Sequence, residues 1–163
     1  MKMSFVDVEK NYLRKMGLPD FEWTTFTLPT EHNPLKKIIR QSRVAIVATA
    51  GAYLSRTQEP FRTKSIQGDD SFRIIPNETA IETIGLAHPG YVTSRAKKDL
   101  DCVFPLALLN DLRRAGEIGS AAPRHASFMG FIPSAERLLW QQAPKVGRIL
   151  LQDEVDLVIL VPS

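Results

Sequence analysis

The chain has 163 residues, of which 44% are hydrophobic and 24% are charged, and its formal net charge is +3. These values fit one globular domain with its own hydrophobic core, and the charge is too small to indicate a nucleic-acid-binding protein. The only cysteine, Cys102, leaves no internal disulfide and no cysteine-based metal site. The sequence shows no hydrophobic leader and no run near the roughly 18 apolar residues of a membrane span, so we expect a cytoplasmic protein without membrane contact.

The N-terminal residues 1–34 predict a helix followed by an extended arm. Within residues 1–17, apolar side chains can share one helical face and Gly17 can end the helix. Residues 18–34 hold three prolines together with Phe21, Trp23 and Phe26, which is typical of an arm that lies on a surface of the same molecule or of a second protomer; His32 is expected to be structural. We therefore predict two parts, residues 1–34 and residues 35–163.

A short helix is expected at residues 35–41. The basic side chains at its end have helical spacing and lack interleaved aromatic residues, so they indicate a solvated helix face rather than a nucleic-acid site: Lys36, Lys37, Arg40 and Arg43.

The remaining pattern alternates strands and helices. Residues 43–51 and the last segment, 155–163, are predicted to be buried strands, because their apolar runs are of the kind that parallel sheets bury on both faces. Further strands are expected at 71–76 and 81–86, and helices at 105–115, after Ser134, and again from Pro144. Strands separated by helices predict a single-domain, three-layer α/β/α sandwich with a mostly parallel sheet.

Ligands of such sheets bind beyond the carboxyl ends of the strands, where two histidine-containing segments are expected. His88 follows an apolar strand and can act as a general acid or base, with Tyr91 assisting; the alternative is a histidine that caps a turn. Arg124 and His125 form the best candidate for anion binding, against an equally plausible structural role. Gly51, at the end of the first long strand, permits a close backbone approach to a ligand.

Acidic side chains supply the other candidates. Asp70 and Arg73 can orient each other beside a ligand or form a salt-bridged turn before an edge strand. Asp99 and Asp101 can raise each other's pKa, or Asp101 can cap the following helix. Cys102 between them is expected to be a small core residue. No spacing matches a dinucleotide fingerprint or a phosphate loop, so we expect no cofactor and no metal.

Eight collinear segments together resemble a known family. They are 44–51 (VAIVATAG), 58–61 (QEPF), 68–76 (GDDSFRIIP), 88–91 (HPGY), 99–106 (DLDCVFPL), 116–119 (GEIG), 124–130 (RHASFMG) and 155–162 (VDLVILVP). From about residue 40 to the end, the chain resembles the selenoprotein B family of glycine, sarcosine, betaine and D-proline reductases, and most closely its short, proline-reductase-like members. The chain departs from the family pattern at Val92 or Thr93, where an acid is usual, at Asp101 and at Ala126.

The resemblance implies reductive cleavage of a C–N bond in a small amino acid with electrons from thiols. In that scheme Arg73 and Arg124 hold the substrate carboxylate, His88, His125 and Tyr91 handle protons, and Asp70 and Asp99 orient these groups. The family places a selenocysteine or cysteine motif after the final strand, where this sequence stops. The nucleophile is then encoded beyond a UGA codon, carried by a redox partner subunit, or absent. The rival functions are a non-catalytic interaction subunit, including a homo-oligomer embraced by the arm, and a cofactor-free acid/base enzyme acting on a small carboxylate.

Overall fold

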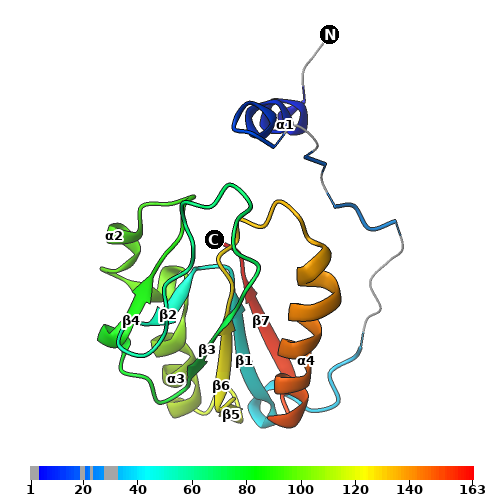
Figure 1. Ribbon diagram of the computed structural model, residues 1–163. Helices are drawn as coiled ribbons and strands as arrows, with labels where there is room; N and C mark the ends of the chain where they lie inside the picture. The colour runs from blue at the N-terminus through cyan, green and yellow to red at the C-terminus, as the bar shows by residue number, and fades with distance from the viewer. Residues whose placement is uncertain (1–3, 19–20, 23, 28–32) are drawn as a thin grey trace.

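The computed structural model describes residues 4–18, 21–22, 24–27 and 33–163. Its first element is α1 (Phe5–Lys15), which begins at a capping box: Ser4 Oγ accepts a hydrogen bond from the Asp7 amide at 3.2 Å, and the Asp7 carboxylate accepts one from the Ser4 amide at 3.1 Å. The predicted helix at the N-terminus is therefore confirmed. Figure 1 shows α1 at the top of the view, on the side of the domain where the C-terminus lies.

The main sheet is built around β1 (Arg43–Ala48). The strand β7 (Leu157–Val161) pairs with it in parallel along one edge, from Val44 opposite Leu157 to Ala48 opposite Val161. Along the other edge run β5 (Ser120–Ala121) and then β6 (Arg124–Ser127), both parallel to β1. The continuous apolar sequence of β1 is explained by this central position, with neighbours on both edges (Figure 1).

The other strands are antiparallel. On the far side of β6, β3 (Arg73–Pro76) runs against it, and β2 (Ala52–Leu54) and β4 (Ile84–Leu86) form a separate two-stranded antiparallel sheet. The helical segments after α1 are η1 (Ile39–Gln41), which precedes β1, and then η2 (Ile81–Thr83), α2 (Thr93–Ala96), η3 (Leu100–Cys102), α3 (Leu106–Arg114), the π-helical turn η4 (Leu138–Gln142) and α4 (Ala143–Gln152).

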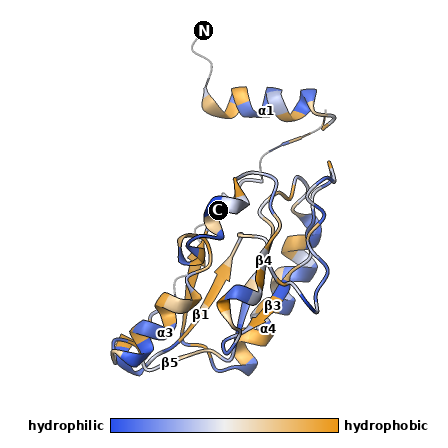
Figure 2. Ribbon diagram, turned by 90° about the vertical axis from the view of Figure 1, so that its left-hand side faces the viewer, coloured by the Kyte–Doolittle hydropathy of each residue, from blue (hydrophilic) through white to orange (hydrophobic). Residues whose placement is uncertain are grey.

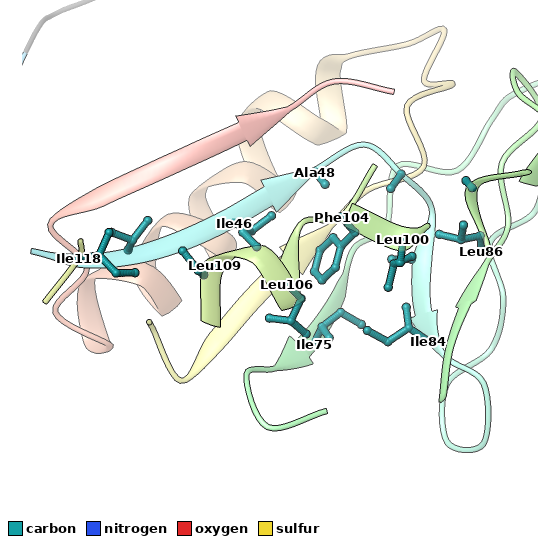
Figure 3. Close-up of a cluster of buried hydrophobic side chains, with 14 residues drawn as sticks. Ile46, Ala48, Ile75, Ile84, Leu86, Leu100, Phe104, Leu106, Leu109 and Ile118 are labelled. Atoms are coloured by element: carbon teal, nitrogen blue, oxygen red, sulfur yellow. The ribbon is translucent and has the colours of Figure 1, made fainter. Parts of the chain in front are cut away.

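Alternating side chains of β1 enter two different apolar clusters. Val44, Ile46 and Ala48 belong to a large buried cluster to which α3 contributes Leu106 and Leu109 (Figure 3). On the opposite face, Val47 packs against a smaller cluster that contains Val146 of α4. Figure 2 shows the hydrophobic colour concentrated on β1 inside the domain. Burial on both faces holds β1 rigid and so fixes the position of the loop that follows it.

The structure confirms a single mixed α/β domain and corrects its details. The expected three-layer sandwich with a mostly parallel sheet is not confirmed, because β3 is antiparallel and β2 and β4 form their own sheet. The strands expected at 43–51, 71–76 and 155–163 are present in shorter form as β1, β3 and β7, and of the strand expected at 81–86 only 84–86 is a strand, β4. The sequence did not predict β2, β5 or β6. No helix among the described residues is long and apolar enough to cross a membrane.

The structure bears only in part on two predictions for the N-terminal region, the short helix at 35–41 and the extended arm. The helix expected at 35–41 is only the short turn η1, and its basic side chains form ion pairs at the surface, Lys37 with Asp156 and Arg40 with Glu117. In the arm, Phe26 is 73% exposed; Trp23 and His32 lie outside the described residues. The boundary at residue 34 stays a prediction.

Candidate functional site

The segments that follow β1, β4, β6 and β7 meet at one edge of the domain. The Gly51 amide donates to Phe128 O at 2.7 Å, and the Ala87 amide donates to Gly51 O at 2.9 Å. At the end of β7, the Ser163 amide donates to Thr49 Oγ1 at 2.8 Å. The carboxyl ends of strands from both sheets are thus tied together, as the sequence predicts for a ligand site.

Gly51 holds this junction together for a steric reason. Its φ is +67°, and a Cβ at this position would lie 2.1 Å from Ala87 O and 3.4 Å from His88 Cβ. Only glycine fits there. The close approach predicted for Gly51 is real, but its partner is the backbone that carries His88.

His88 lies at the centre of this edge. Its Nδ1 accepts a hydrogen bond from the Gly90 amide at 2.9 Å, so the proton of the neutral ring is on Nε2. Nε2 is buried and has no hydrogen-bond partner among the described residues. Burial lowers the pKa of His88 below its ordinary value, which keeps the ring neutral at pH 7. A buried N–H without a partner is costly and uncommon in a folded protein, which makes His88 the first candidate for a functional residue at this edge.

Tyr91 supports His88 from the side. The two ring centroids are 4.6 Å apart, and the Tyr91 hydroxyl donates to Ala50 O at 2.6 Å. Burial, and after it the nearby Cys102 thiol, raise the pKa of Tyr91 to about 12. Its phenol is therefore a neutral donor already used by the backbone. Cys102 itself is exposed, so the expectation that it is a core residue is wrong.

A pocket of about 510 Å³ opens beside His88. Four loop segments line it, 63–66, 88–90, 130–133 and Ser163 at the end of β7, and the N-terminal segment closes it with one face of α1 and with Leu18 and Phe21. Most of the lining is apolar, and its charged side chains are Glu9 and Lys64. This volume is in the usual range for small-molecule sites.

The two other basic candidates are held elsewhere. Arg124 opens β6, at the opposite end of that strand from the Gly130 loop, and binds the buried Asp153 through two parallel hydrogen bonds, Nε to Oδ2 at 2.9 Å and Nη2 to Oδ1 at 2.6 Å. The guanidinium of Arg73 lies over the Phe61 ring at 4.4 Å and donates to Glu59 O at 2.9 Å. Neither arginine lines the pocket.

His125 is a core residue in this structure. Its side chain is only 1% exposed, its Nδ1 accepts from the Ile46 amide at 3.0 Å, and its Nε2 lies 3.2 Å from Asn77 Oδ1. Backbone pairing with β1 is interrupted between β5 and β6, and the imidazole supplies the acceptor that Ile46 lacks there. Burial lowers the pKa of His125 to about 4, although Asp153 acts in the other direction.

The aspartates expected at the site hold loops and helix ends. Asp99 accepts from the Asp101 amide at 3.2 Å, and Asp101 accepts from the Ala107 amide at 3.0 Å at the start of α3, which matches its helix-capping alternative. Asp70 pairs with Arg137 at 3.2 Å. The structure thus brings His88, Tyr91 and Gly51 together and places Arg73, Arg124, His125 and the three aspartates at other contacts.

Several pocket residues were not candidates in the sequence reading. Gly130, with φ +86°, leaves room for His88, because a Cβ there would lie 2.7 Å from His88 Nε2. Glu9 and Lys64 carry no recognisable motif, and only their convergence on the pocket identifies them. The sequence signal that could have found Gly130 is its place in the family-like segment 124–130. Within the described parts of the chain, no group of three or more His, Cys, Asp or Glu side chains could hold a metal ion.

Comparison with known proteins shows to which family the chain belongs. The model of the glycine/sarcosine/betaine reductase selenoprotein B matches residues 10–163. The D-proline reductase subunit gamma of Acetoanaerobium sticklandii is 29% identical over 144 residues, which cover 88% of this chain and 58% of that protein. The chain therefore spans less than two thirds of the length of this relative. No solved structure was found to match. The resemblance in the sequence is confirmed, and the chain belongs to the glycine/sarcosine/betaine reductase selenoprotein B family.

Proposed function

We propose that the chain is a subunit of a selenoprotein B-type reductase, which cleaves a C–N bond of a small amino acid with electrons from thiols, and that the pocket beside His88 binds the substrate. Membership of the family and the likeness to a protein named as a D-proline reductase subunit support the reaction class. The observation that carries the choice of site is the buried, unpartnered Nε2 of His88 at the junction of the strand ends. We expect the subunit to act in the cytoplasm, where thiols stay reduced.

His88 acts in this proposal as a neutral hydrogen-bond donor. Its Nδ1 is occupied by the Gly90 amide, and its lowered pKa keeps a positive charge off the ring. The Nε2–H can then bind a substrate oxygen in a largely apolar pocket, where hydrogen bonds are stronger than in water. Tyr91 is a positioning residue, because its ring flanks the imidazole while its hydroxyl is bound to Ala50 O.

The nucleophile is a selenol or thiol that reaches the pocket at the end of β7. Ser163 lines the pocket, so a group carried next to it, on a following segment or on a partner subunit, would face the substrate. Its anion forms a bond to the α-carbon while the C–N bond breaks, and the amine leaves with the electron pair. A second thiolate then attacks the selenium or sulfur; the carbon leaves with the electron pair and takes a proton, and the two chalcogen atoms end as a selenenyl sulfide or disulfide.

The test combines binding and turnover. Glycine, sarcosine, betaine and D-proline are titrated into the chain by calorimetry. Their reduction by a dithiol is measured separately. For this assay the chain is expressed from its own locus, with read-through of any UGA codon and co-expression of the subunits encoded by adjacent genes. We expect one of the four to bind and to be reduced, and His88→Gln to reduce both signals at least tenfold. The control His125→Asn changes a histidine outside the pocket and retains both.

Two outcomes contradict the proposal. If none of the four compounds binds or is reduced, the assignment of this subunit to substrate reduction is wrong. If a compound is reduced and His88→Gln leaves binding and turnover unchanged, the site lies elsewhere. Turnover by the isolated chain without any thiol would instead favour the cofactor-free acid/base enzyme.

A further inference from the structure

The two charged side chains in the pocket have opposite signs and come from distant parts of the sequence. Glu9 lies on α1, and Lys64 lies in the loop 63–66. Within the described residues neither forms an ion pair, whereas the neighbouring cations of α1, Lys10 and Arg14, both pair with Glu22. Of the charges near this helix, Glu9 and Lys64 are therefore the pair left facing the pocket.

The spacing along α1 explains why Glu9 faces inward. Glu9, Leu13 and Met16 lie at positions i, i+4 and i+7, which share one helical face. Leu13, at 9% exposed, is the buried residue of this helix, and all three side chains line the pocket. The pairing of Lys10 and Arg14 with Glu22 keeps these two cations away from that face. The N-terminal helix thus contributes a carboxylate and an apolar surface to the site.

The arginines expected to hold a substrate carboxylate are occupied. Arg124 is bound to Asp153, and Arg73 donates to Glu59 O and to Ser71 Oγ at 2.9 Å. Lys64 is the cation that does face the pocket. A lysine binds a carboxylate as a point charge without bidentate geometry, so it suits substrates that differ in size around a common carboxylate.

We propose that Glu9 and Lys64 together bind a zwitterionic amino acid, with Lys64 on its carboxylate and Glu9 on its ammonium group. This inference rests on the proposed function of the pocket. A zwitterion can pair with both charges at once, whereas a simple acid or a simple amine can pair with only one of them. The hydrocarbon part of the ligand then contacts apolar lining residues such as Leu13, Ile66 and Phe131.

The test uses the full chain and defined probes. Glycine and D-proline are each compared by calorimetry with the acid that lacks the amino group (acetate, cyclopentanecarboxylate) and with the amine that lacks the carboxylate (methylamine, pyrrolidine). We expect at least one amino acid to bind tenfold or more tightly than both of its partial analogues. Glu9→Gln should weaken the amino acid and the amine while sparing the acid, and Lys64→Gln should weaken the amino acid and the acid while sparing the amine.

Matched controls separate this effect from a general change in charge. Glu22→Gln removes a carboxylate that pairs with Lys10 and Arg14, and Lys98→Gln removes a lysine that does not line the pocket; both should bind like the wild type. Unchanged amino acid affinity in Glu9→Gln and Lys64→Gln overturns this inference and leaves the proposed function intact. Failure of every amino acid to bind the wild type, together with absence of reduction, removes the proposed function itself.

Discussion

Gly130 makes room for His88: a Cβ on Gly130 would lie 2.7 Å from His88 Nε2 and 3.1 Å from Thr49 O. The φ of +86° at Gly130 also belongs to the left-handed region that favours glycine. Two independent requirements, one of conformation and one of space, therefore meet at one residue. Their coincidence beside an unpartnered imidazole N–H is the structural basis for placing the site here.

The substitution Gly130→Ala should both destabilise the fold and displace His88. The strained φ alone costs about 1–2 kcal/mol, and the new methyl group additionally pushes the imidazole away from its place between Gly90 and Tyr91. We expect a drop in the free energy of unfolding, measured in urea, and a loss of amino acid affinity by calorimetry.

Gly116→Ala is the matched control for this change. Gly116 has φ +71° with no heavy atom within 4 Å of an added Cβ, so it carries the conformational cost without the clash. It should lower stability by the conformational cost alone, about 1–2 kcal/mol, and leave affinity unchanged. Equal affinities for the wild type and Gly130→Ala would show that His88 does not need this space.

Stability should fall in mild acid because of His125. Its folded pKa of about 4 lies below the ordinary 6.5, so between these values the unfolded chain binds the extra proton and the folded chain does not. The stabilisation is fully present above pH 6.5 and is lost progressively as the pH falls toward 4. We expect a loss of about 2 kcal/mol between pH 7.5 and 5, measured by urea unfolding.

The variant His125→Asn isolates this contribution. An asparagine oxygen can replace Nδ1 as the acceptor for the Ile46 amide and does not titrate. Whatever its absolute stability, its unfolding free energy should change less with pH than that of the wild type. The lowered pKa of His88 acts in the same direction and accounts for a remaining slope. An identical slope in both proteins would contradict a neutral, buried His125.

Tyr91→Phe should affect stability more than binding. The change removes the hydrogen bond to the buried Ala50 O and costs about 1–3 kcal/mol, while the ring still flanks His88. Tyr91→Ala should in addition shift the NMR signals of the His88 ring and weaken amino acid binding. Loss of turnover in Tyr91→Phe at unchanged stability would instead indicate that the phenol donates a proton in the reaction.

Arg124→Gln should lower the melting temperature and spare the ligand. Its partner Asp153 is only 8% exposed, and removing the guanidinium leaves that carboxylate without its bidentate partner. The second change Asp153→Asn should recover part of the loss. If thermal stability is unaltered and amino acid affinity is lost, Arg124 binds the substrate and the account of its role is wrong.

The elements with clear periodicity could be predicted from the sequence. The apolar run of β1, the proline-started α3 and the terminal strand β7 follow from residue type alone. The strand β6 could not be predicted, because Arg124 and His125 are polar. Their hydrogen-bond partners, Asp153, the Ile46 amide and Asn77, come close to them only in the folded chain. The three-residue β2 is too short to show a pattern.

Some residues of the candidate site could likewise be predicted from the sequence, and others could not. His88, Tyr91 and Gly51 could be predicted because they follow strands, and strand ends of a sheet meet by geometry. The structure places Arg124 and His125 away from this pocket, and as neighbours in a strand they point to opposite faces of it. Glu9 and Lys64 could not be predicted, since they are far apart in the sequence and only folding brings both to the lining of one pocket.

The most direct measurement is the nitrogen NMR spectrum of the histidine rings during titration with glycine, sarcosine, betaine and D-proline. The account predicts that the Nε2 signal of His88 shifts as one of these ligands saturates, while the signals of His125 in the core stay in place. A saturating ligand that moves the His125 signals and leaves those of His88 unchanged would contradict the account.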